Sequence, residues 1–579
     1  MRNATKGNRV RFLLDEEFFE ELHRQLCRIE LLDPDPLTYV LVAMWLCKPD
    51  TQLPAVTVQQ GSRSTRVAGR TFINAITSLT QRGHPVKFVL WNGANPVEWP
   101  RKLISVPYNW LRWAGSLTGL IRYEPLDSGL LRFGGGARVF SEALSFRARS
   151  TPNMQVYAES YSPNWLAQHG LTASNHQKFV VCSHAGRLEA LLGGFNINES
   201  YSAKTDHGLV GERWHDTAVL IEGPAAHAVQ TEWLRRWNKQ YWYGGDTLPA
   251  RLEDQGFIHH GSKKQTAQRL VNGWNTGVTI ATTNGEPFTR ENDIRDLVIE
   301  RIKVATKYIY LENYALTDPA LVAALSKRMA EKKDLKVIVL VTHPKNPYYS
   351  TPISWSPMEY YTFVQLSLPR FTHVRIVTTH EIALGATEDE EQVLDPATAK
   401  FVSAENGTFT WSEGGQTKSC SFDDIAELEA PTVMYGPIST DLAGSEVLPR
   451  NAANAKKPQW PYVHSKLALF DDQVAFVGSS NWTYRSMEYD GEITAMVTGE
   501  ETVRGIRERL FEHWQQGLTV DNYATKAAKN EQDRVARRLR PVHSYMLPLS
   551  FGDFLHSAEV TLVGSPKAWL YSKATWRFW

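Results

Sequence analysis

The sequence carries one short arrangement of histidine, lysine, glycine and asparagine twice. His176 and Lys178 stand at the head of one apolar run, and His464 and Lys466 stand at the head of another, 288 residues further along the chain. Small residues and an asparagine follow each pair: Gly193, Gly194 and Asn196 in the first copy, and Gly478, Ser479 and Asn481 in the second. The His-to-Asn spacing is 20 residues in the first copy and 17 in the second, so the copies agree in order and in scale.

A His-x-Lys triplet alone carries little information, because about one is expected by chance in a chain of this composition. A third triplet, His343-Pro344-Lys345, contains a proline, begins no apolar run and has no Gly-x-x-Asn after it. We expect this third triplet to mark the end of a strand that enters a loop. The two other triplets share their context, and this agreement indicates a shared function.

These residue types suit a displacement at the phosphorus atom of a phosphodiester. Attack on phosphorus builds negative charge on the equatorial oxygens, and two lysines would offset that charge without a metal ion. The two asparagine amides can donate hydrogen bonds to the same oxygens. One histidine can attack phosphorus and form a covalent phosphohistidine. The other can protonate the leaving alcohol and then deprotonate the incoming water or alcohol. The two copies therefore predict one site at a pseudo-twofold seam.

Each imidazole also needs a partner that orients its second ring nitrogen. Asp216 and Glu492 follow the two motifs and are the best acidic candidates, with Glu488 and Asp490 as close rivals of Glu492. The symmetry of the two copies leaves open which histidine attacks. The remaining histidines show no spacing typical of a metal site.

The elements that must position these residues alternate between helix and strand, which is the pattern of an α/β protein. The periodicity predicts helices over 72–79, 292–307 and from Pro319 onward, with Asp318 as the N-cap of the last. It predicts strands over 86–91, 308–311 and 335–341. The segments 175–181 and 463–470 also have the composition of strands, which would point His and Lys of each motif to the same side.

The repeat divides the chain into an N-terminal half, residues 10–250, and a C-terminal half, residues 276–579. The polar, irregular stretch 246–275 is the expected seam. An acidic stretch rich in Gly, Ser, Thr and Pro at about 385–460 predicts a low-order insert, either a lid or a flexible connection. A C-terminal extension is expected from about residue 520.

Composition excludes several classes of protein. The 579 residues include 63 Lys and Arg against 62 Asp and Glu, and a net charge of +1 disfavours a general nucleic-acid coat. A hydrophobic fraction of 42% excludes a disordered chain. Four scattered cysteines form neither a disulfide framework nor a zinc signature. The longest apolar run near the N-terminus has nine residues, far short of the roughly 20 that span a bilayer. We therefore expect a soluble chain, cytoplasmic where it is synthesised, with export without a cleaved signal peptide left open.

The sequence resembles the phospholipase D superfamily, whose signature is H-x-K-x4-D followed by G-[GS]-x-N. The second copy matches it fully, including Asp471, whereas Ser183 stands in the first copy where the family has Asp. The segments 214–224, 308–313 and 485–492 are similar to the family's W-H-D…G-P, I-Y-I-E-N and R-S…D-x-E segments. The resemblance covers about residues 10–520 and is strongest to bacterial toxin- and effector-type and eukaryotic-like phospholipases D.

The resemblance implies an α/β fold with two similar α/β/α halves, each with a mixed central sheet and flanking helices, around one shared active site. It implies that Asp216 serves His464 and that Glu492 serves His176, with His176 as nucleophile and His464 as acid and base. Asp471, Gly193, Gly194, Gly478 and Ser479 would support the site. No cofactor or metal would be required.

The implied function is hydrolysis of phospholipid headgroups to phosphatidic acid, with transfer to primary alcohols as a side reaction. The implied partner is the surface of a phospholipid bilayer, bound peripherally. Tryptophans suit such a surface or the interior of the protein, and they cluster at Trp91, Trp99, Trp110, Trp113, Trp569, Trp576 and Trp579. Three alternatives stay open: a superfamily nuclease, a lipid synthase that transfers phosphatidyl groups, and a catalytically weakened interaction protein. The sequence does not indicate an oligomeric state.

Overall fold

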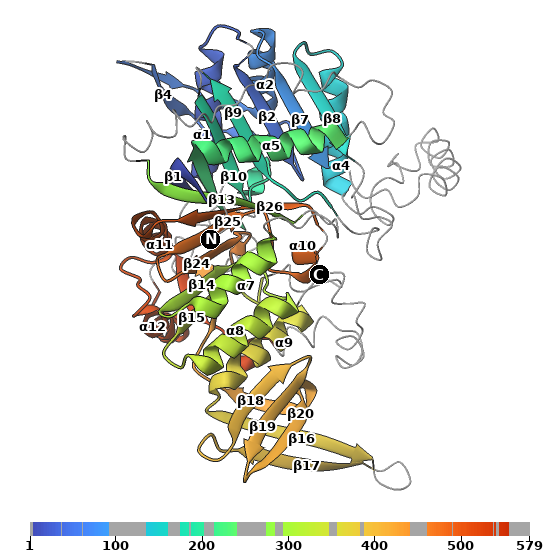
Figure 1. Ribbon diagram of the computed structural model, residues 1–579, viewed down its shortest axis with the longest axis vertical. Helices are drawn as coiled ribbons and strands as arrows, with labels where there is room; N and C mark the ends of the chain where they lie inside the picture. Colours follow the sequence, from blue (N-terminus) through green and yellow to red (C-terminus); the bar gives the residue numbers. More distant parts are fainter. Residues whose placement is uncertain are drawn as a thin grey trace, which may run out of the picture.

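The computed structural model describes residues 4–35, 37–60, 62–91, 135–159, 174–184, 187–201, 214–239, 274–283, 293–346, 356–381, 387–439, 460–488, 490–536, 538–539 and 544–554. Within these ranges a mixed sheet of 15 strands runs through both halves, in the order β27-β22-β15-β14-β24-β25-β26-β13-β1-β12-β10-β9-β2-β7-β8. The two halves join through antiparallel pairing of β1 (Thr5–Leu14) with β13 (Thr276–Thr283). In Figure 1 the N-terminal half lies above this junction and the C-terminal half below it.

The two halves repeat the same strand order outward from the junction. In the N-terminal half, β1 is followed by β12 (Thr217–Glu222), β10 (Arg187–Gly193), β9 (Phe179–His184), β2 (Tyr39–Met44), β7 (Val86–Trp91) and β8 (Met154–Glu159). In the C-terminal half, β13 is followed by β26 (Glu492–Thr498), β25 (Val474–Gly478), β24 (Leu467–Phe470), β14 (Tyr308–Glu312), β15 (Lys336–Leu340) and β22 (Met434–Ser439). In both halves the first four pairings are antiparallel and the last two are parallel. This order confirms the pseudo-twofold α/β fold, with the two predicted sheets joined into one.

Helices repeat in the same way and cover both faces of the sheet (Figure 1). The equivalent pairs are α1 (Glu16–Glu30) with α7 (Ile294–Val304), α2 (Phe72–Gln81) with α8 (Pro319–Glu331), α4 (Gly135–Ala148) with α9 (Ser356–Ser367), and α5 (Pro224–Lys239) with α11 (Glu500–Trp514). One apolar core lies under α5 and α11 and continues across the junction, with Trp233, Trp237, Phe511 and Trp514 among its members. The other face has a separate core in each half. The continuous core makes the two halves one packed unit.

Local sequence explains where these helices begin. Asp318 accepts a hydrogen bond from the Leu321 backbone N–H at 2.9 Å, and Pro319 occupies the first turn of α8, as predicted. Asp293 caps α7 and Thr71 caps α2 in the same manner. The predicted helices at 72–79 and 292–307 and the predicted strands at 86–91, 308–311 and 335–341 are confirmed within a few residues.

The remaining described elements are short or lie at the edges. They comprise β3 (Gln52–Leu53), β4 (Val56–Gln60), β5 (Arg63–Val67), β6 (Arg70–Thr71), β11 (Trp214–His215), β23 (Tyr462–Val463) and α10 (Tyr484–Glu488), with 3-10 turns at Glu199–Tyr201, Leu368–Arg370 and Phe422–Asp424. The C-terminal extension supplies α12 (Tyr523–Val535) and β27 (Ser544–Pro548), and β27 pairs with β22 at the edge of the large sheet. The extension is therefore part of the C-terminal half.

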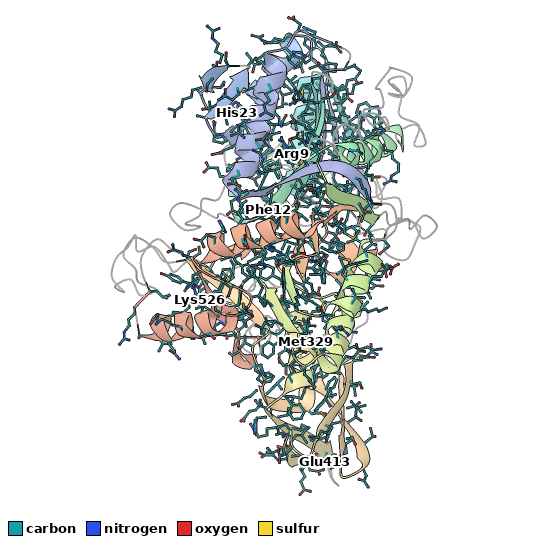
Figure 2. The ribbon with its side chains drawn as sticks, turned by 60° about the vertical axis from the view of Figure 1, so that its left-hand side comes forward. Arg9, Phe12, His23, Met329, Glu413 and Lys526 are labelled. Carbon is teal, nitrogen blue, oxygen red and sulfur yellow. The ribbon has the colours of Figure 1, made fainter. Side chains whose placement is uncertain are left out.

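Two expectations about local structure are wrong. The motif segments do not begin as strands: β9 starts at Phe179 and β24 at Leu467, so both His-x-Lys triplets precede their strands. The insert is not of low order in its described part. It contains β17 (Thr387–Leu394), β18 (Lys400–Glu405), β19 (Thr408–Glu413), β20 (Gln416–Ser421) and β21 (Ile425–Glu429). β16 (His373–Glu381), which lies just ahead of the predicted bounds, pairs with β17 and β21. With β16, these strands form two three-stranded sheets at one end of the molecule, with Glu413 at the far tip (Figure 2).

The polar composition of the insert explains the second error. Most side chains of β17 are exposed, so its sequence reads as a loop. Only Phe409, Trp411 and Phe422 and a few others are buried, and they pack against the core of the C-terminal half. A half-buried strand is recognised by alternating apolar and polar residues, and a run of acidic residues hides that alternation. Residues 440–459 of the predicted insert, and 246–273 of the predicted seam, lie outside the described residues.

Candidate active site

Each His-x-Lys segment is held by the opposite half of the chain. The His176 N–H donates to the Gly491 carbonyl at 2.8 Å, and the His464 N–H donates to the His215 carbonyl at 2.8 Å. Next to these contacts, β11 pairs in parallel with β23, and Asn175 forms an isolated parallel bridge with Gly491. Because the backbone of each triplet bonds across the seam, neither triplet belongs to the strand that follows it.

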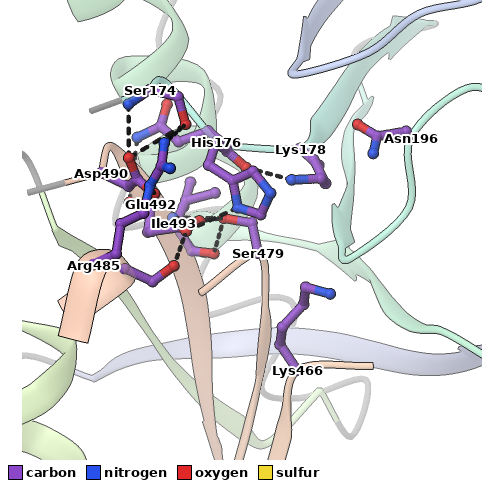
Figure 3. A network of polar contacts seen from close by, with 12 residues as sticks. Ser174, His176, Lys178, Asn196, Lys466, Ser479, Arg485, Asp490, Glu492 and Ile493 are labelled. Atoms are coloured by element: carbon purple, nitrogen blue, oxygen red, sulfur yellow. Dashed lines mark hydrogen bonds and ion pairs between the residues drawn. The ribbon is translucent and has the colours of Figure 1, made fainter. Parts of the chain in front are cut away.

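The two acids cross the seam in the same way. Nδ1 of His176 lies 2.8 Å from Oε1 of Glu492, and Nδ1 of His464 lies 2.7 Å from Oδ2 of Asp216. Both carboxylates are fully buried. These are the pairs that the resemblance implied, and each leaves Nε2 of its histidine for chemistry. Figure 3 shows the His176 side of the arrangement, with Glu492 and the lysines of both halves.

The rivals of Glu492 have other partners. Glu488 pairs with Arg295. Asp490 accepts the Ser174 N–H at 2.6 Å and the Arg485 guanidinium at 2.7 Å (Figure 3). Among the acids considered, Glu492 is therefore the one that contacts His176 directly.

Each acid is further fixed by its own half. Glu492 accepts hydrogen bonds from the Ser479 hydroxyl at 2.5 Å and from the Ser486 hydroxyl at 2.8 Å. Asp216 accepts the Thr217 N–H at 2.8 Å. The position equivalent to Ser479 in the first copy is Gly194, and it carries no side chain because the Asp216 carboxylate lies against it: a Cβ there would be 2.0 Å from Oδ1. The second glycine of the first motif is thus explained by the place of Asp216.

We expect Gly194→Ala to reduce kcat at least about 100-fold, because the added methyl group must displace Asp216 from His464, and misplacement by about 1 Å costs that much in an enzyme site. Steady-state kinetics with a circular dichroism check of folding would measure it. Gly505→Ala on α11 is the matched control, since a Cβ there meets nothing within 4 Å. Unchanged kcat in Gly194→Ala would show that Asp216 does not need this position.

The two lysines converge on the site from different halves. The Lys178 ammonium donates to the His176 carbonyl at 2.7 Å, and the Lys466 ammonium donates to the His464 carbonyl. Both lysines are buried, and burial lowers the pKa of Lys178 to about 7 and that of Lys466 to about 8. Burial, and then the adjacent lysine, holds the pKa of each histidine well below its usual value. A site with this much convergent positive charge favours an anion.

We expect kcat/KM on a phosphodiester to fall as the pH rises through about 7 to 8. The sign follows from the lowered lysine pKa values: each ammonium exists below its pKa and is lost above it. A neutral amine cannot offset phosphate charge. The dependence of kcat should be weaker, because a bound anion raises the pKa of both lysines. A kcat/KM profile that is flat from pH 7 to pH 10 would contradict this expectation.

The two motif asparagines are buried at equivalent places after β10 and β25. Asn196 accepts the Leu46 N–H at 3.0 Å and donates to the Tyr201 hydroxyl at 2.7 Å. That hydroxyl lies 3.5 Å from Nε2 of His464. Tyr201 therefore links Asn196 to His464, a contact that the sequence analysis missed. No local signal marks Tyr201, because only the tertiary structure places it beside a histidine of the other half.

Aromatic side chains line both histidines. The Trp45 ring lies 5.8 Å from the His176 ring and 5.3 Å from the Trp91 ring, and the Trp214 ring lies 5.3 Å from the His464 ring. Trp91 is buried in this stack, so it serves the interior, whereas Trp99, Trp110, Trp113, Trp569, Trp576 and Trp579 lie outside the described residues. Trp45 could have been found from the repeat, because it follows β2 as Tyr314 follows β14.

Asp471 and Ser183 brace equivalent strands. The Asp471 carboxylate accepts the backbone N–H groups of Thr306, Lys307 and Tyr308 at 2.7 to 2.8 Å, just where β14 begins. The Ser183 hydroxyl donates to the Leu37 carbonyl at 2.5 Å, ahead of β2. Serine thus keeps hydrogen bonding at this position and loses the charge. Neither residue contacts the histidines directly through these bonds.

Among the described residues, Asp15 and His215, both buried, and the half-buried His513 form a group with the spacing of metal ligands, although no sequence motif indicates a metal site. His215 faces a carboxylate with each ring nitrogen: Asp15 Oδ1 and Glu312 Oε2 both lie at 3.2 Å. Contacts of both ring nitrogens with carboxylates are typical of a histidine in ion pairs, here with Asp15 and Glu312. The prediction that the reaction requires no cofactor stays a prediction.

Comparisons with known proteins place the second motif in a known domain family. Residues 439–514, which include the second motif and Glu492, match a family model described as the phospholipase D-like domain of cardiolipin synthase. Cardiolipin synthase A of Pseudomonas entomophila is 23% identical over 231 residues, which are 39% of this chain and 42% of that protein. The major cardiolipin synthase of Bacillus subtilis is 25% identical over 193 residues, which are 33% of this chain and 34% of that protein. The chain thus spans less than half of the length of these relatives.

Similar solved structures include phosphatidylserine synthase of Haemophilus influenzae and the phospholipase D family member Nuc of Salmonella typhimurium. The match to the synthase covers 93% of this chain and 96% of the synthase chain, with 11% sequence identity and a TM-score of 0.42. The match to Nuc covers 42% of this chain and 97% of the Nuc chain, with 12% sequence identity and a TM-score of 0.22. In the described ranges no helix has both the length and the apolar character needed to cross a membrane. The family match and the sequence similarity to the two cardiolipin synthases support the membership of this chain in the phospholipase D superfamily.

Proposed function

We propose that this protein is a phosphodiesterase of the phospholipase D type that acts on phospholipid headgroups through a covalent phosphohistidine. The observation that carries the proposal is the pair of histidine–carboxylate contacts across the seam, at 2.8 and 2.7 Å, beside two buried lysines. Together they supply two oriented imidazoles and fixed positive charge, which are the requirements for a two-step displacement at phosphorus. The similarity to cardiolipin synthases supports phospholipid as the substrate class.

The mechanism follows from which nitrogen of each histidine ring contacts a carboxylate. Nδ1 of each histidine faces a carboxylate, so Nε2 is the reactive atom on both rings. In the first step His176 Nε2 forms a bond to phosphorus while the P–O bond to the headgroup breaks, and His464 gives its Nε2 proton to the leaving oxygen. In the second step His464 removes a proton from water, the water oxygen bonds to phosphorus, and the P–N bond to His176 breaks. Lys178 and Lys466 stabilise the equatorial oxygens in both steps.

The second candidate is phosphatidyl transfer to an alcohol, as in a lipid synthase. The same phosphohistidine would be attacked by an alcohol in place of water, with His464 as the base. The observation that favours this candidate is that the relatives named above are cardiolipin synthases. The two functions share the site and the first step, and they differ only in the acceptor.

Product analysis on mixed phospholipid vesicles distinguishes the candidates. Vesicles that contain phosphatidylcholine, phosphatidylethanolamine and phosphatidylglycerol would be incubated with the protein, with and without ethanol. Hydrolysis predicts phosphatidic acid, with phosphatidylethanol when ethanol is present, whereas a synthase predicts cardiolipin and glycerol from phosphatidylglycerol. Degradation of DNA without any lipid turnover would support a superfamily nuclease and contradict the proposal. Absence of turnover of every phosphodiester would support a non-enzymatic interaction protein.

The remaining expectations belong to this proposal. Peripheral contact with a bilayer surface follows from a phospholipid substrate. The toxin- or effector-type subfamily stays a prediction, because the relatives reported above are synthases.

A further inference from the structure

A buried ionic network lies behind the His464 side of the site. His215, which precedes Asp216, is fully buried, with Nδ1 at 3.2 Å from Asp15 Oδ1 and Nε2 at 3.2 Å from Glu312 Oε2. A neutral imidazole has one N–H and cannot donate to both carboxylates. A doubly protonated ring, an imidazolium between two buried acids, is therefore the form that this arrangement favours.

The network is tied to His464 through backbone and side chain. The Asp216 N–H donates to Asp15 Oδ1 at 2.9 Å, and the Asp15 N–H donates to the Asp216 carbonyl at 3.0 Å. The His215 carbonyl accepts the N–H groups of His464 and Ser465 at 2.8 and 3.1 Å. Movement of His215 would therefore move the backbone of His464 and the acid that orients its ring.

The other end of the network reaches the second asparagine motif. Glu312 Oε1 accepts the Tyr310 hydroxyl and the Trp514 indole N–H, each at 2.7 Å. The Glu312 carbonyl accepts the Trp482 indole N–H at 3.0 Å, and Trp482 directly follows Asn481. The His215–Glu312 pair thus joins the acid segment of the N-terminal half to the asparagine segment of the C-terminal half.

The His176 side has no equivalent of this pair. Ala43 pairs with Phe179 as Glu312 pairs with Leu467, so Ala43 occupies the place of Glu312. The Gly491 carbonyl accepts the His176 N–H, and the His215 carbonyl accepts the His464 N–H. Gly491 therefore occupies the place of His215. The charged pair is therefore a departure from the pseudo-twofold symmetry, and it distinguishes the two histidines.

We propose that His215 is a positioning residue of the His464 side of the site, where its charge, held by Asp15 and Glu312, keeps Asp216 ionised and aimed at His464. The proposal rests on the proposed function and makes the two sides chemically unequal. An ionised Asp216 stabilises the protonated form of His464, which is the form that an acid catalyst needs. The asymmetry therefore agrees with His464 as the acid and base and His176 as the nucleophile.

The charges around these groups set the direction of any pH effect. Burial by itself would lower the pKa of His215, but Asp15 and Glu312 raise it to about 10. Burial raises the pKa of Asp216 to about 7, opposed by the charges of Lys466, His215 and Lys178. On the far side of the network, His513 of α11 contacts Asp15 Oδ2 at 3.0 Å. Loss of the His215 charge therefore raises the pKa of Asp216 further.

The test compares pH profiles of wild type, His215→Gln and the double variant His215→Gln with Glu312→Gln. The double variant replaces the ion pair by two amides and guards against misfolding of the single variant. We expect the acid limb of kcat/KM on phosphatidylcholine vesicles to move to higher pH by about one unit. We expect kcat to fall about tenfold with little change in KM. An acid limb at the wild-type pH in both variants would overturn the proposal, whereas a wild type without turnover would instead contradict the proposed function.

A second measurement needs no activity. The raised pKa of His215 adds stability that is complete below pH 6.5 and is lost as the pH rises through about 10. Glu312→Gln should therefore lower Tm more at pH 6 than at pH 9.5. The control Asp472→Asn removes an ion pair with Arg507 away from the site and should lower Tm equally at both pH values. An equal loss in Glu312→Gln, or a metal ion retained by purified wild type and lost in His215→Gln, would overturn the assignment of His215 as a paired cation.

Discussion

His176→Ala is expected to reduce headgroup release from phospholipid vesicles by at least about 10⁴-fold, because removal of a nucleophile removes the covalent route. The ring of His176 is held by Glu492 at Nδ1 and by Gly491 at the backbone, so its Nε2 is fixed relative to both lysines. Alanine retains the backbone contact and deletes only the ring. No phosphohistidine should form in this variant when it is mixed with substrate and quenched with alkali.

The control for this variant is His380→Ala, since His380 is an exposed histidine on β16, which pairs with the insert, far along the chain from both motifs. It should retain wild-type activity. Circular dichroism and thermal unfolding would show whether His176→Ala is folded. A folded His176→Ala protein with more than a few per cent of wild-type turnover would rule out His176 as the nucleophile.

His464→Ala is expected to separate the two steps of the reaction. Loss of the acid should reduce turnover of natural phospholipids by about 10²- to 10⁴-fold, the usual contribution of a general acid–base group. A phosphodiester with a nitrophenolate leaving group needs no proton on departure, so its first step should survive. The second step lacks a base, so a phosphohistidine should accumulate and be detectable by mass spectrometry on the peptide that contains His176.

The outcome of this trapping experiment decides between the two histidines. Nitrophenolate should appear as a burst of about one equivalent and then stop. A covalent adduct on His464 in the His176→Ala protein, with none on His176 in the His464→Ala protein, would reverse the roles. That result would also place the His215 network behind the nucleophile.

Much of the site was predictable because its chemistry is repeated. The two His-x-Lys copies, their asparagines and the alternation of helix and strand all lie in short segments of sequence. The acids were found because they lie in segments with a recognisable resemblance, although spacing alone did not separate Glu492 from Asp490. Hydrogen bonds separate them: Asp490 is occupied by Ser174 and Arg485.

Other parts could not be read from local patterns. The triplets look like the first residues of strands because apolar residues follow them, yet their N–H groups bond to the opposite half. Tyr201 and Asp15 are ordinary in their local sequence and acquire significance only through partners that lie far away in the chain. Glu312 lies in a segment with a recognisable resemblance, but that segment does not indicate its contact with His215. The insert reads as irregular because the buried residues of its strands are few and widely spaced.

The sequence by itself indicated the type of chemistry, the twofold repeat and most of the residues of the candidate site, since residue type and short spacing are local properties. Tertiary structure alone separated Glu492 from its rival Asp490, and it placed the buried His215 behind His464 but only Gly491 behind His176. The physical reason is that these contacts join residues roughly 100 to 300 positions apart, and their energies depend on burial. Burial strengthens each charge–charge contact and raises the cost of any unpaired group, and it is a property of the folded chain rather than of any segment.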